Sequence, residues 1–163
     1  MDEIVTTPII FFSGLDRTGK TTTRKQFAVQ TNQKYITFDR SPIDNLVYDE
    51  AFRRKQVSES GRREFYEKFK RLGDVYIVHM TLDFEEVNKR TKASEGSEYP
   101  MGELVLCNHL FNLYFEEAEQ SGIKMIRVQC DNKTVDEVVN EVVSKLGGVK
   151  KKKKKKGDIR FGC

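Results

Sequence analysis

The sequence is poor in the residues that build disulfide frameworks and metal centres, and it has no long hydrophobic run. Its three cysteines, at positions 107, 130 and 163, are odd in number and widely spaced, which argues against a disulfide framework or a zinc site and favours a reducing, intracellular setting. The two histidines, His79 and His109, have no partners at ligand spacing, so we expect each to be a packed or surface residue. The longest apolar run, Pro8–Phe12, is far too short to span a bilayer, and no signal-peptide pattern precedes it. We therefore expect a cytoplasmic protein without a membrane partner. A protein encoded by a virus or phage is compatible with this expectation.

The net charge of +4 comes from one end of the chain. Seven consecutive lysines, Lys150–Lys156, are followed by Asp158 and Arg160. Without this end the 29 basic residues fall to 21 and the 25 acidic residues to 24, so residues 1–149 are mildly acidic. A block of like charges cannot pack, which predicts a folded domain over 1–149 and a disordered lysine-rich tail over 150–163. The tail is either a solubilising, low-complexity or added end, or an arm that contacts DNA.

Short apolar runs alternate with amphipathic segments along residues 1–149. The runs are rich in β-branched and aromatic residues, as expected of strands in a parallel sheet that is buried on both faces. Four such strands are predicted: Pro8–Ser13, Lys34–Asp39, Val75–Thr81 and Lys124–Gln129. Helices are predicted between them, over 20–31, Glu59–Leu72, Asp83–Lys92 and Glu103–Ser121. This alternation predicts an α/β fold with a mostly parallel sheet flanked by helices.

A last helix is predicted by its own start and stop signals. Thr134 and Glu137 form a capping box, and an apolar stripe follows at helical spacing. Gly147-Gly148 is expected to end this helix and the folded domain. We expect the apolar faces of the helices to pack in the core. They comprise Phe65, Phe69 and Leu72; Cys107, Leu110, Phe111, Tyr114 and Ala118; and Val135, Val138, Val139, Val142, Val143 and Leu146.

The stretch Gly14–Thr21 matches the phosphate-loop pattern G-x-x-x-x-G-K-[ST], directly after a predicted strand and at the start of a helix. Its glycines permit a sharp turn whose backbone N–H groups converge on phosphates. Lys20 is expected to reach the β- and γ-phosphates, and Thr21 to place its hydroxyl on Mg²⁺. This context makes a chance match a poor explanation and predicts a P-loop NTPase fold that binds ATP with Mg²⁺. The residues expected at ATP are Gly14, Leu15, Asp16, Arg17, Thr18, Gly19, Lys20, Thr21 and Thr22, with Arg90.

A second signal is Phe38-Asp39-Arg40-Ser41, at the carboxyl end of the second predicted strand. Ligands of open parallel sheets bind at that edge. Asp39 could accept the proton of a substrate hydroxyl or organise water on Mg²⁺, and Arg40 could hold a phosphate with two hydrogen bonds. The alternative is an ordinary turn that carries a surface ion pair.

GLDRTGKTT, together with FDRS and the PIDNLVY that follows, resembles thymidylate kinases, particularly those of the eukaryotic type. The resemblance implies that Asp16 lies near the acceptor's deoxyribose and that Arg17 neutralises charge on the transferred phosphoryl group. It makes Asp16, Arg17, Lys20 and Asp39 the catalytic candidates, and Asp16, Asp39 and Arg40 the acceptor-binding ones. Bacterial members of the family take the catalytic arginine from a lid instead. Here the lid, expected over Thr91–Gly102, contains no arginine, in agreement with a loop that carries one.

The chain also departs from that family. Thymidylate kinases insert a strand and two helices before the Asp-Arg motif, and the insert carries an arginine for the acceptor phosphate and groups that stack on thymine. Here the first helix runs almost directly into Lys34–Asp39. The candidate replacements are Arg53, Arg54, Arg62 and Arg63, each of which could instead be a solvated charge. Arg90 matches a family arginine at the adenine and phosphate side, or it is a solvated charge at a helix end.

The leading functional hypothesis is an ATP-dependent phosphotransferase that moves the γ-phosphate to a deoxynucleotide resembling thymidylate. A second hypothesis keeps this chemistry but takes as acceptor a nucleotide or hydroxymethylated base within DNA, flipped out or single-stranded. A third is a nucleotide-binding P-loop protein without catalysis. The argument against it is the combined presence of Asp16, Arg17, Lys20, Thr21, Asp39 and Arg40. The sequence leaves the oligomeric state open, a homodimer included.

Overall fold

The computed structural model of the chain describes residues 7–15, 17–97 and 100–151. Four strands form one sheet in the order β2-β1-β3-β4, and every neighbouring pair is parallel. The carboxyl ends of all four strands therefore meet at one edge of the sheet. The strands are β1 (Ile9–Gly14), β2 (Ile36–Asp39), β3 (Val75–Thr81) and β4 (Lys124–Gln129).

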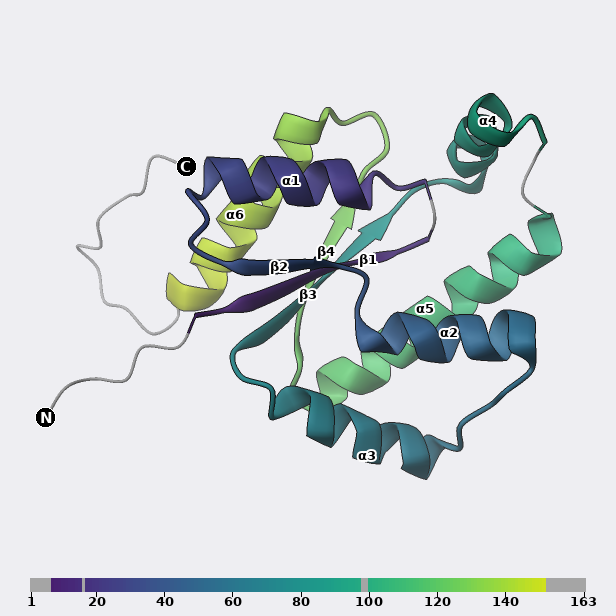
Figure 1. Cartoon of the computed structure of the whole chain (residues 1–163), viewed down its shortest axis with the longest axis horizontal. Coiled ribbons are helices and arrows are strands. Elements are labelled where there is room, and N and C mark those ends of the chain that lie inside the picture. The colour runs from purple at the N-terminus through teal and green to yellow at the C-terminus, as the bar shows by residue number, and fades with distance from the viewer. Residues whose placement is uncertain (1–6, 16, 98–99, 152–163) are drawn as a thin grey trace, which may run out of the picture.

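Helices cover both faces of this sheet, as Figure 1 shows. Helices α1 (Lys20–Gln30) and α6 (Val135–Lys151) lie together on one face. The opposite face carries α2 (Pro42–Arg53), α3 (Glu59–Lys70) and α5 (Met101–Gln120), with α5 in contact with both of the others. Helix α4 (Phe84–Glu95) lies beyond the carboxyl edge of the sheet. The α/β fold with a parallel sheet flanked by helices is confirmed.

The local signals in the sequence explain where the elements begin. All four predicted strands are present, and the two central ones, β1 and β3, are almost completely buried. The predicted capping box at α6 is confirmed: the backbone N–H of Thr134 donates to Glu137 at 2.9 Å, and that of Glu137 donates to Thr134 Oγ1 at 3.1 Å. Helix α2, which the sequence indicated only through its resemblance, starts with a second capping box between Ser41 and Asp44 and has proline at its first turn.

The prediction that Gly147-Gly148 ends the last helix is wrong, because α6 continues through both glycines to Lys151. A glycine inside a helix costs only about 1 kcal/mol relative to alanine, so two near a helix end need not stop it. The boundary predicted between 149 and 150 thus falls inside α6. Lys152–Lys156 and the rest of the predicted tail lie outside the described residues.

Two residues of the predicted apolar faces are not in the core. Leu72 is 60% exposed, because α3 ends at Lys70 and the turn that follows breaks the helical spacing. Val135 is 36% exposed, because it is the first residue of α6. The face predicted on α5 is confirmed, with Cys107, Leu110, Phe111, Tyr114 and Ala118 all buried. None of the described helices is both long and apolar enough to cross a membrane.

Candidate phosphate-binding site

The sharp turn after β1 depends on close approach between two strands. Gly14, the last residue of β1, has φ 134° and pairs with Met80 of β3. A Cβ atom at position 14 would lie 2.2 Å from the carbonyl oxygen of Met80, so only glycine fits there. The chain can therefore leave the sheet at this point and turn into the loop. Asp16, which the sequence analysis assigned to the acceptor, lies outside the described residues.

The loop folds back over the start of α1. Gly19 is the N-cap residue of α1 and has φ 86°, a conformation that few other residues adopt without strain. Lys20 is largely buried, and its ammonium donates hydrogen bonds to the carbonyl oxygens of Gly14 at 2.7 Å and Leu15 at 2.9 Å. Thr18 donates to the same Leu15 carbonyl at 2.9 Å. The ammonium of Lys20 is thus held beneath the loop, at the N-terminus of a helix, where phosphate groups are favoured.

Thr21 and Asp39 meet at the carboxyl edge although they come from different elements. Thr21 Oγ1 donates to Asp39 Oδ2 at 3.0 Å, and Arg24 Nε donates to Asp39 Oδ1 at 2.8 Å. The register of β1 and β2 places Asp39 beside Phe12, one strand away from the loop. A hydroxyl and a carboxylate at this spacing are the hard oxygen donors that Mg²⁺ takes from a protein when phosphates and water complete its shell. The predicted pair therefore fits a magnesium ion. No group of three or more His, Cys, Asp or Glu side chains among the described residues could hold a metal ion by itself.

Arg17 extends from the loop toward the end of α4. Its φ of 67° is left-handed, and its guanidinium forms an ion pair with Glu95 at 2.5 Å. Its carbonyl oxygen accepts a hydrogen bond of 2.9 Å from Arg90, whose Nε also contacts Glu86 at 3.2 Å. Helix α4 therefore holds the loop at two points, one on the backbone and one on the side chain.

These residues enclose a cavity of about 640 Å³ at the carboxyl edge of the sheet. The cavity is lined by five of the residues predicted at ATP, by both members of the Asp-Arg motif, and by one acid from α4. Arg40, with φ 66°, also places its guanidinium 5.5 Å from the centre of the Tyr48 ring. The residues that line the cavity are Arg17, Gly19, Lys20, Thr21, Thr22, Asp39, Arg40 and Glu95.

Arg90 lines a second cavity, of about 680 Å³. This cavity lies between the first turns of α4 and the turn that follows β4. Asp131, in that turn, accepts hydrogen bonds from the backbone N–H of Asp83 and from Gln129. Although partial burial opposes it, these bonds hold the pKa of Asp131 below its ordinary value. The lining residues are Asp83, Glu85, Glu86, Lys89, Arg90, Asp131, Asn132, Lys133 and Thr134.

A layer of buried polar groups lies beneath the loop. Ser13 of β1 pairs in register with His79 of β3, and both side chains are inaccessible to solvent. Asp44 Oδ1 accepts hydrogen bonds from Ser41 Oγ at 2.8 Å and from the Ser41 N–H at 3.2 Å. Burial raises the pKa of Asp44, and nearby Ser41 and Lys20 partly offset that rise. Burial likewise lowers the pKa of His79 to about 4, so its imidazole is neutral at physiological pH.

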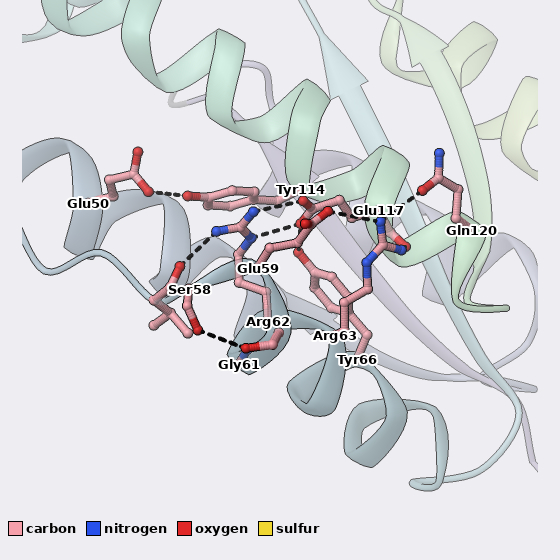
Figure 2. Close-up of polar contacts among 12 residues, drawn as sticks. Glu50, Ser58, Glu59, Gly61, Arg62, Arg63, Tyr66, Tyr114, Glu117 and Gln120 are labelled. Carbon is pink, nitrogen blue, oxygen red and sulfur yellow. Dashed lines mark hydrogen bonds and ion pairs between the residues drawn. The ribbon is translucent and has the colours of Figure 1, made fainter.

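The four arginines suggested as replacements for the missing phosphate contact do not line the cavity. Figure 2 shows Arg62 directed instead at Glu117, which it contacts at 2.8 and 2.7 Å, while Tyr66 donates to the same carboxylate at 2.8 Å. Both charges of this pair are almost fully buried, so Arg62 is neither a ligand-binding nor a solvated residue. Arg63 binds Gln120 and Arg53 pairs with Asp49. The cations around the cavity are Arg17, Lys20 and Arg40.

Sequence reasoning missed three residues of this region. Arg24 lies one turn after Thr21 on α1, and that spacing could have placed it beside Asp39. Asp44 follows Ser41 by three residues, a capping-box spacing that was not used. Glu95 lies in the predicted lid, where the resemblance drew attention to arginine and not to an acid that could pair with Arg17. The first five residues of that lid, Thr91–Glu95, form the end of α4.

Comparisons with known proteins support the fold and go no further. A scan against protein-family models and a search of curated proteins each found no match. Among solved structures, the chain is similar to the YorR protein of Bacillus subtilis in complex with phosphorylated GDP, with a TM-score of 0.63 and 18% identity over 85% of this chain and 95% of that chain. A gluconokinase from Sinorhizobium meliloti 1021 aligns with a TM-score of 0.47 and 12% identity, over 87% of this chain and 93% of that one.

The fold and the phosphate loop together define a P-loop NTPase fold. The strand, glycine-rich turn and helix occur in the order that the motif requires, and the similarity to YorR extends over most of both chains. The YorR structure is not a thymidylate kinase by name, so that resemblance rests on the motifs alone.

Proposed function

We propose that the protein is an ATP-dependent phosphotransferase that moves the γ-phosphate of ATP to a deoxynucleotide. The observation that carries this proposal is that one cavity at the carboxyl edge brings together Arg17, Lys20, Thr21, Asp39 and Arg40. Two cations on the loop side and one on the β2 side suit a phosphoryl group passing between two phosphate-bearing substrates. The neighbouring YorR structure, with its phosphorylated GDP, agrees with nucleotide chemistry on this fold.

The two cavities, connected through the contact of Arg90 with the loop, suggest how ATP lies. Its phosphates occupy the cavity at Lys20, whose ammonium exchanges loop carbonyl oxygens for phosphate oxygens. Its base and ribose occupy the second cavity, where Arg90 is on the wall and Asp131 and Asn132 offer hydrogen-bonding groups. The assignment of Arg90 to ATP is supported by this position, since Arg90 also holds the loop through the Arg17 carbonyl oxygen.

Thr21 and Asp39 would hold Mg²⁺, directly or through water, at the edge of the phosphate cavity. The ion would neutralise charge on the β- and γ-phosphates. Arg24 keeps the carboxylate of Asp39 oriented toward Thr21, because it occupies the other carboxylate oxygen. Arg17 would meet the phosphoryl group as it leaves ATP, and Asp39 could accept the proton when the acceptor is a hydroxyl.

The acceptor side is supported by an aromatic surface that begins at Arg40. The guanidinium of Arg40 lies over Tyr48, and the Tyr48 ring stacks on Phe52 with centroids 5.9 Å apart. Phe52 is 44% exposed. A planar base can stack on such a surface while its phosphate or sugar hydroxyl reaches the cavity.

A nucleotide or hydroxymethylated base within DNA is the alternative acceptor. One observation favours it: only five residues, 31–35, join α1 to β2, so no insert covers the acceptor side of the cavity. A substrate larger than a free nucleotide could therefore approach β2 and α2.

The test is transfer of radiolabelled γ-phosphate from ATP, screened over deoxynucleoside monophosphates, nucleosides, and single- and double-stranded DNA with and without hydroxymethylated bases. Transfer to a monophosphate supports the leading proposal, and transfer to DNA alone supports the alternative. Lys20→Ala is the control, and it should abolish transfer without unfolding the protein, because Lys20 faces the phosphates. ATP binding with no transfer to any acceptor would contradict both and leave a nucleotide-binding protein.

A further inference from the structure

The ion pair between Arg17 and Glu95 places a carboxylate in a cavity that should bind phosphates. Glu95 is the last residue of α4 and lines the same cavity as Lys20 and Thr21. Its contact with Arg17 is 2.5 Å, and the two side chains are 37% and 55% exposed, with Arg17 the less exposed. A carboxylate at this position should repel a triphosphate, so its presence in the cavity needs a physical explanation.

We propose that Glu95 is a positioning residue that holds the guanidinium of Arg17 on α4 and releases it only to a γ-phosphate. This rests on the proposed function, since it takes the cavity to be the triphosphate site. In the empty protein Glu95 neutralises Arg17. When ATP binds, the γ-phosphate and Glu95 compete for one guanidinium, and the contact that Arg17 gains is offset by the contact that it loses. Arg17 therefore adds little to ATP binding and remains available for the transition state.

The arrangement of α4 supports this competition. Arg90, on the preceding turns of the same helix, holds the Arg17 carbonyl oxygen at 2.9 Å, so the loop backbone stays in place while the side chain changes partner. Gly96 ends α4 with φ 80°, directly after Glu95. Glu95 can therefore give up Arg17 at the end of α4 without undoing the contact between Arg90 and the loop.

The experiment compares binding of a non-hydrolysable ATP analogue and of ADP, both with Mg²⁺, by calorimetry. Glu95→Gln removes the charge but keeps the size of the side chain. We expect it to tighten binding of the ATP analogue about threefold to fivefold, the upper range for an exposed ion pair, and binding of ADP by less than about 1.5-fold. The difference arises because ADP lacks the phosphate that competes for Arg17.

A double-mutant cycle separates this role from simple repulsion. In an Arg17→Gln background, Glu95→Gln should no longer tighten the ATP analogue, because no guanidinium remains to be released. The matched control is Glu59→Gln, which breaks an exposed Arg–Glu pair on α3 far from the cavity and should change neither affinity. Thermal unfolding of each variant verifies that it is folded.

The outcomes distinguish this inference from the proposed function. If the wild-type protein binds the ATP analogue and Glu95→Gln binds it no more tightly, the role of Glu95 is overturned and the proposed function stands. An equal gain for ADP, or a gain that persists without Arg17, reduces Glu95 to a repulsive charge and overturns it as well. If the wild-type protein binds no ATP analogue, both the proposed function and the role of Glu95 are overturned.

Discussion

Arg17 is the single side chain on which the proposed chemistry depends most. Its guanidinium is already at the phosphate cavity, 2.5 Å from Glu95. Arg17→Gly should lower kcat by at least ~10²-fold, conservatively below the usual range for such arginines. ATP affinity should change little, because the lost phosphate contact is offset by the ion pair that no longer has to break.

Steady-state kinetics and direct titration of ATP against wild-type and Arg17→Gly protein check this prediction. Arg17→Lys is the matched variant, because it keeps the charge but loses the planar guanidinium. Its kcat should lie between those of the wild-type protein and Arg17→Gly. Full kcat in Arg17→Gly would mean that the cation comes from elsewhere. Lys92 is the only basic residue in the predicted lid. The presence of an arginine in the loop and its absence from the lid would then not indicate the source of the catalytic cation.

His79 should make the stability of the protein depend on pH. Its pKa is about 4 when folded, against an ordinary value of 6.5, because burial disfavours the imidazolium. Between these values the unfolded chain binds a proton that the folded chain does not, so stability should fall as the pH drops from 6.5 to 4. The loss from this group should reach about 2–3 kcal/mol at pH 4.5.

Urea unfolding at pH 7 and pH 4.5 measures this, with His79→Leu as the comparison. The variant has no imidazole to titrate, so it should lose less stability between the two pH values than the wild-type protein does. Asp44 acts in the opposite direction, since its raised pKa favours folding as the pH falls. It is present in both proteins, so it largely cancels in the comparison. Equal losses would show that His79 keeps an ordinary pKa.

At the scale of elements, the contact between α3 and α5 contains one buried ion pair. Arg62 and Glu117 bind each other through two hydrogen bonds, and Arg62 also donates to the Val57 carbonyl oxygen at 2.7 Å. Although burial acts to raise it, bonds from Arg62 and Tyr66 keep the pKa of Glu117 below its ordinary value. Glu117→Leu leaves the guanidinium buried without its partner and should destabilise the fold by about 3–5 kcal/mol.

Urea unfolding at pH 7 measures the free energy that Glu117→Leu costs. Glu64→Gln, which breaks an exposed pair with Lys68 on α3, should cost less than about 1 kcal/mol. A double variant, Arg62→Met with Glu117→Leu, should regain most of the loss, because no buried charge then lacks a partner. A cost below about 1 kcal/mol for Glu117→Leu would mean that water reaches the pair.

Most elements were predictable because their signals are local. Each strand is a short apolar run, and α6 begins at a capping box, so neighbouring residues suffice to place them. The pairing of Thr21 with Asp39 also followed, since both end up at the carboxyl edge of a parallel sheet. By contrast, Glu95 meets Arg17 across 78 positions of sequence, and Arg62 meets Glu117 across 55. Such contacts depend on how helices pack, which no local pattern records.

At the scale of the whole molecule, the short path from α1 to β2 shapes both the sheet and the site. β2 pairs directly with β1 and is one of the two edge strands of the sheet. Its residues Ile36 and Phe38 are 45% and 48% exposed, although Phe38 still stacks on Phe11. The Asp-Arg motif at the end of β2 is thus held by one neighbouring strand and by α1. This agrees with an acceptor site that is open on the β2 side.

The predicted basic tail gives the last test at this scale. The chain carries +4 in total, whereas residues 1–149 hold more acids than bases, so Lys150–Lys156 are the main basic segment that could contact DNA outside the acceptor site. Because α6 continues to Lys151, truncation after that residue removes 152–163, with five of the seven lysines, and leaves the helix. If the tail binds DNA, the truncated protein should bind it more weakly and with a flatter salt dependence, by a slope of about 0.9 for each duplex phosphate no longer neutralised. Phosphoryl transfer to free mononucleotides should be unchanged.

A full-length variant with Lys152–Lys156 all changed to Gln separates charge from length. It should behave like the truncated protein, because the effect is one of charge. Titration of labelled DNA at several salt concentrations measures all three proteins, and equal affinity in all of them would reduce the tail to a solubilising end.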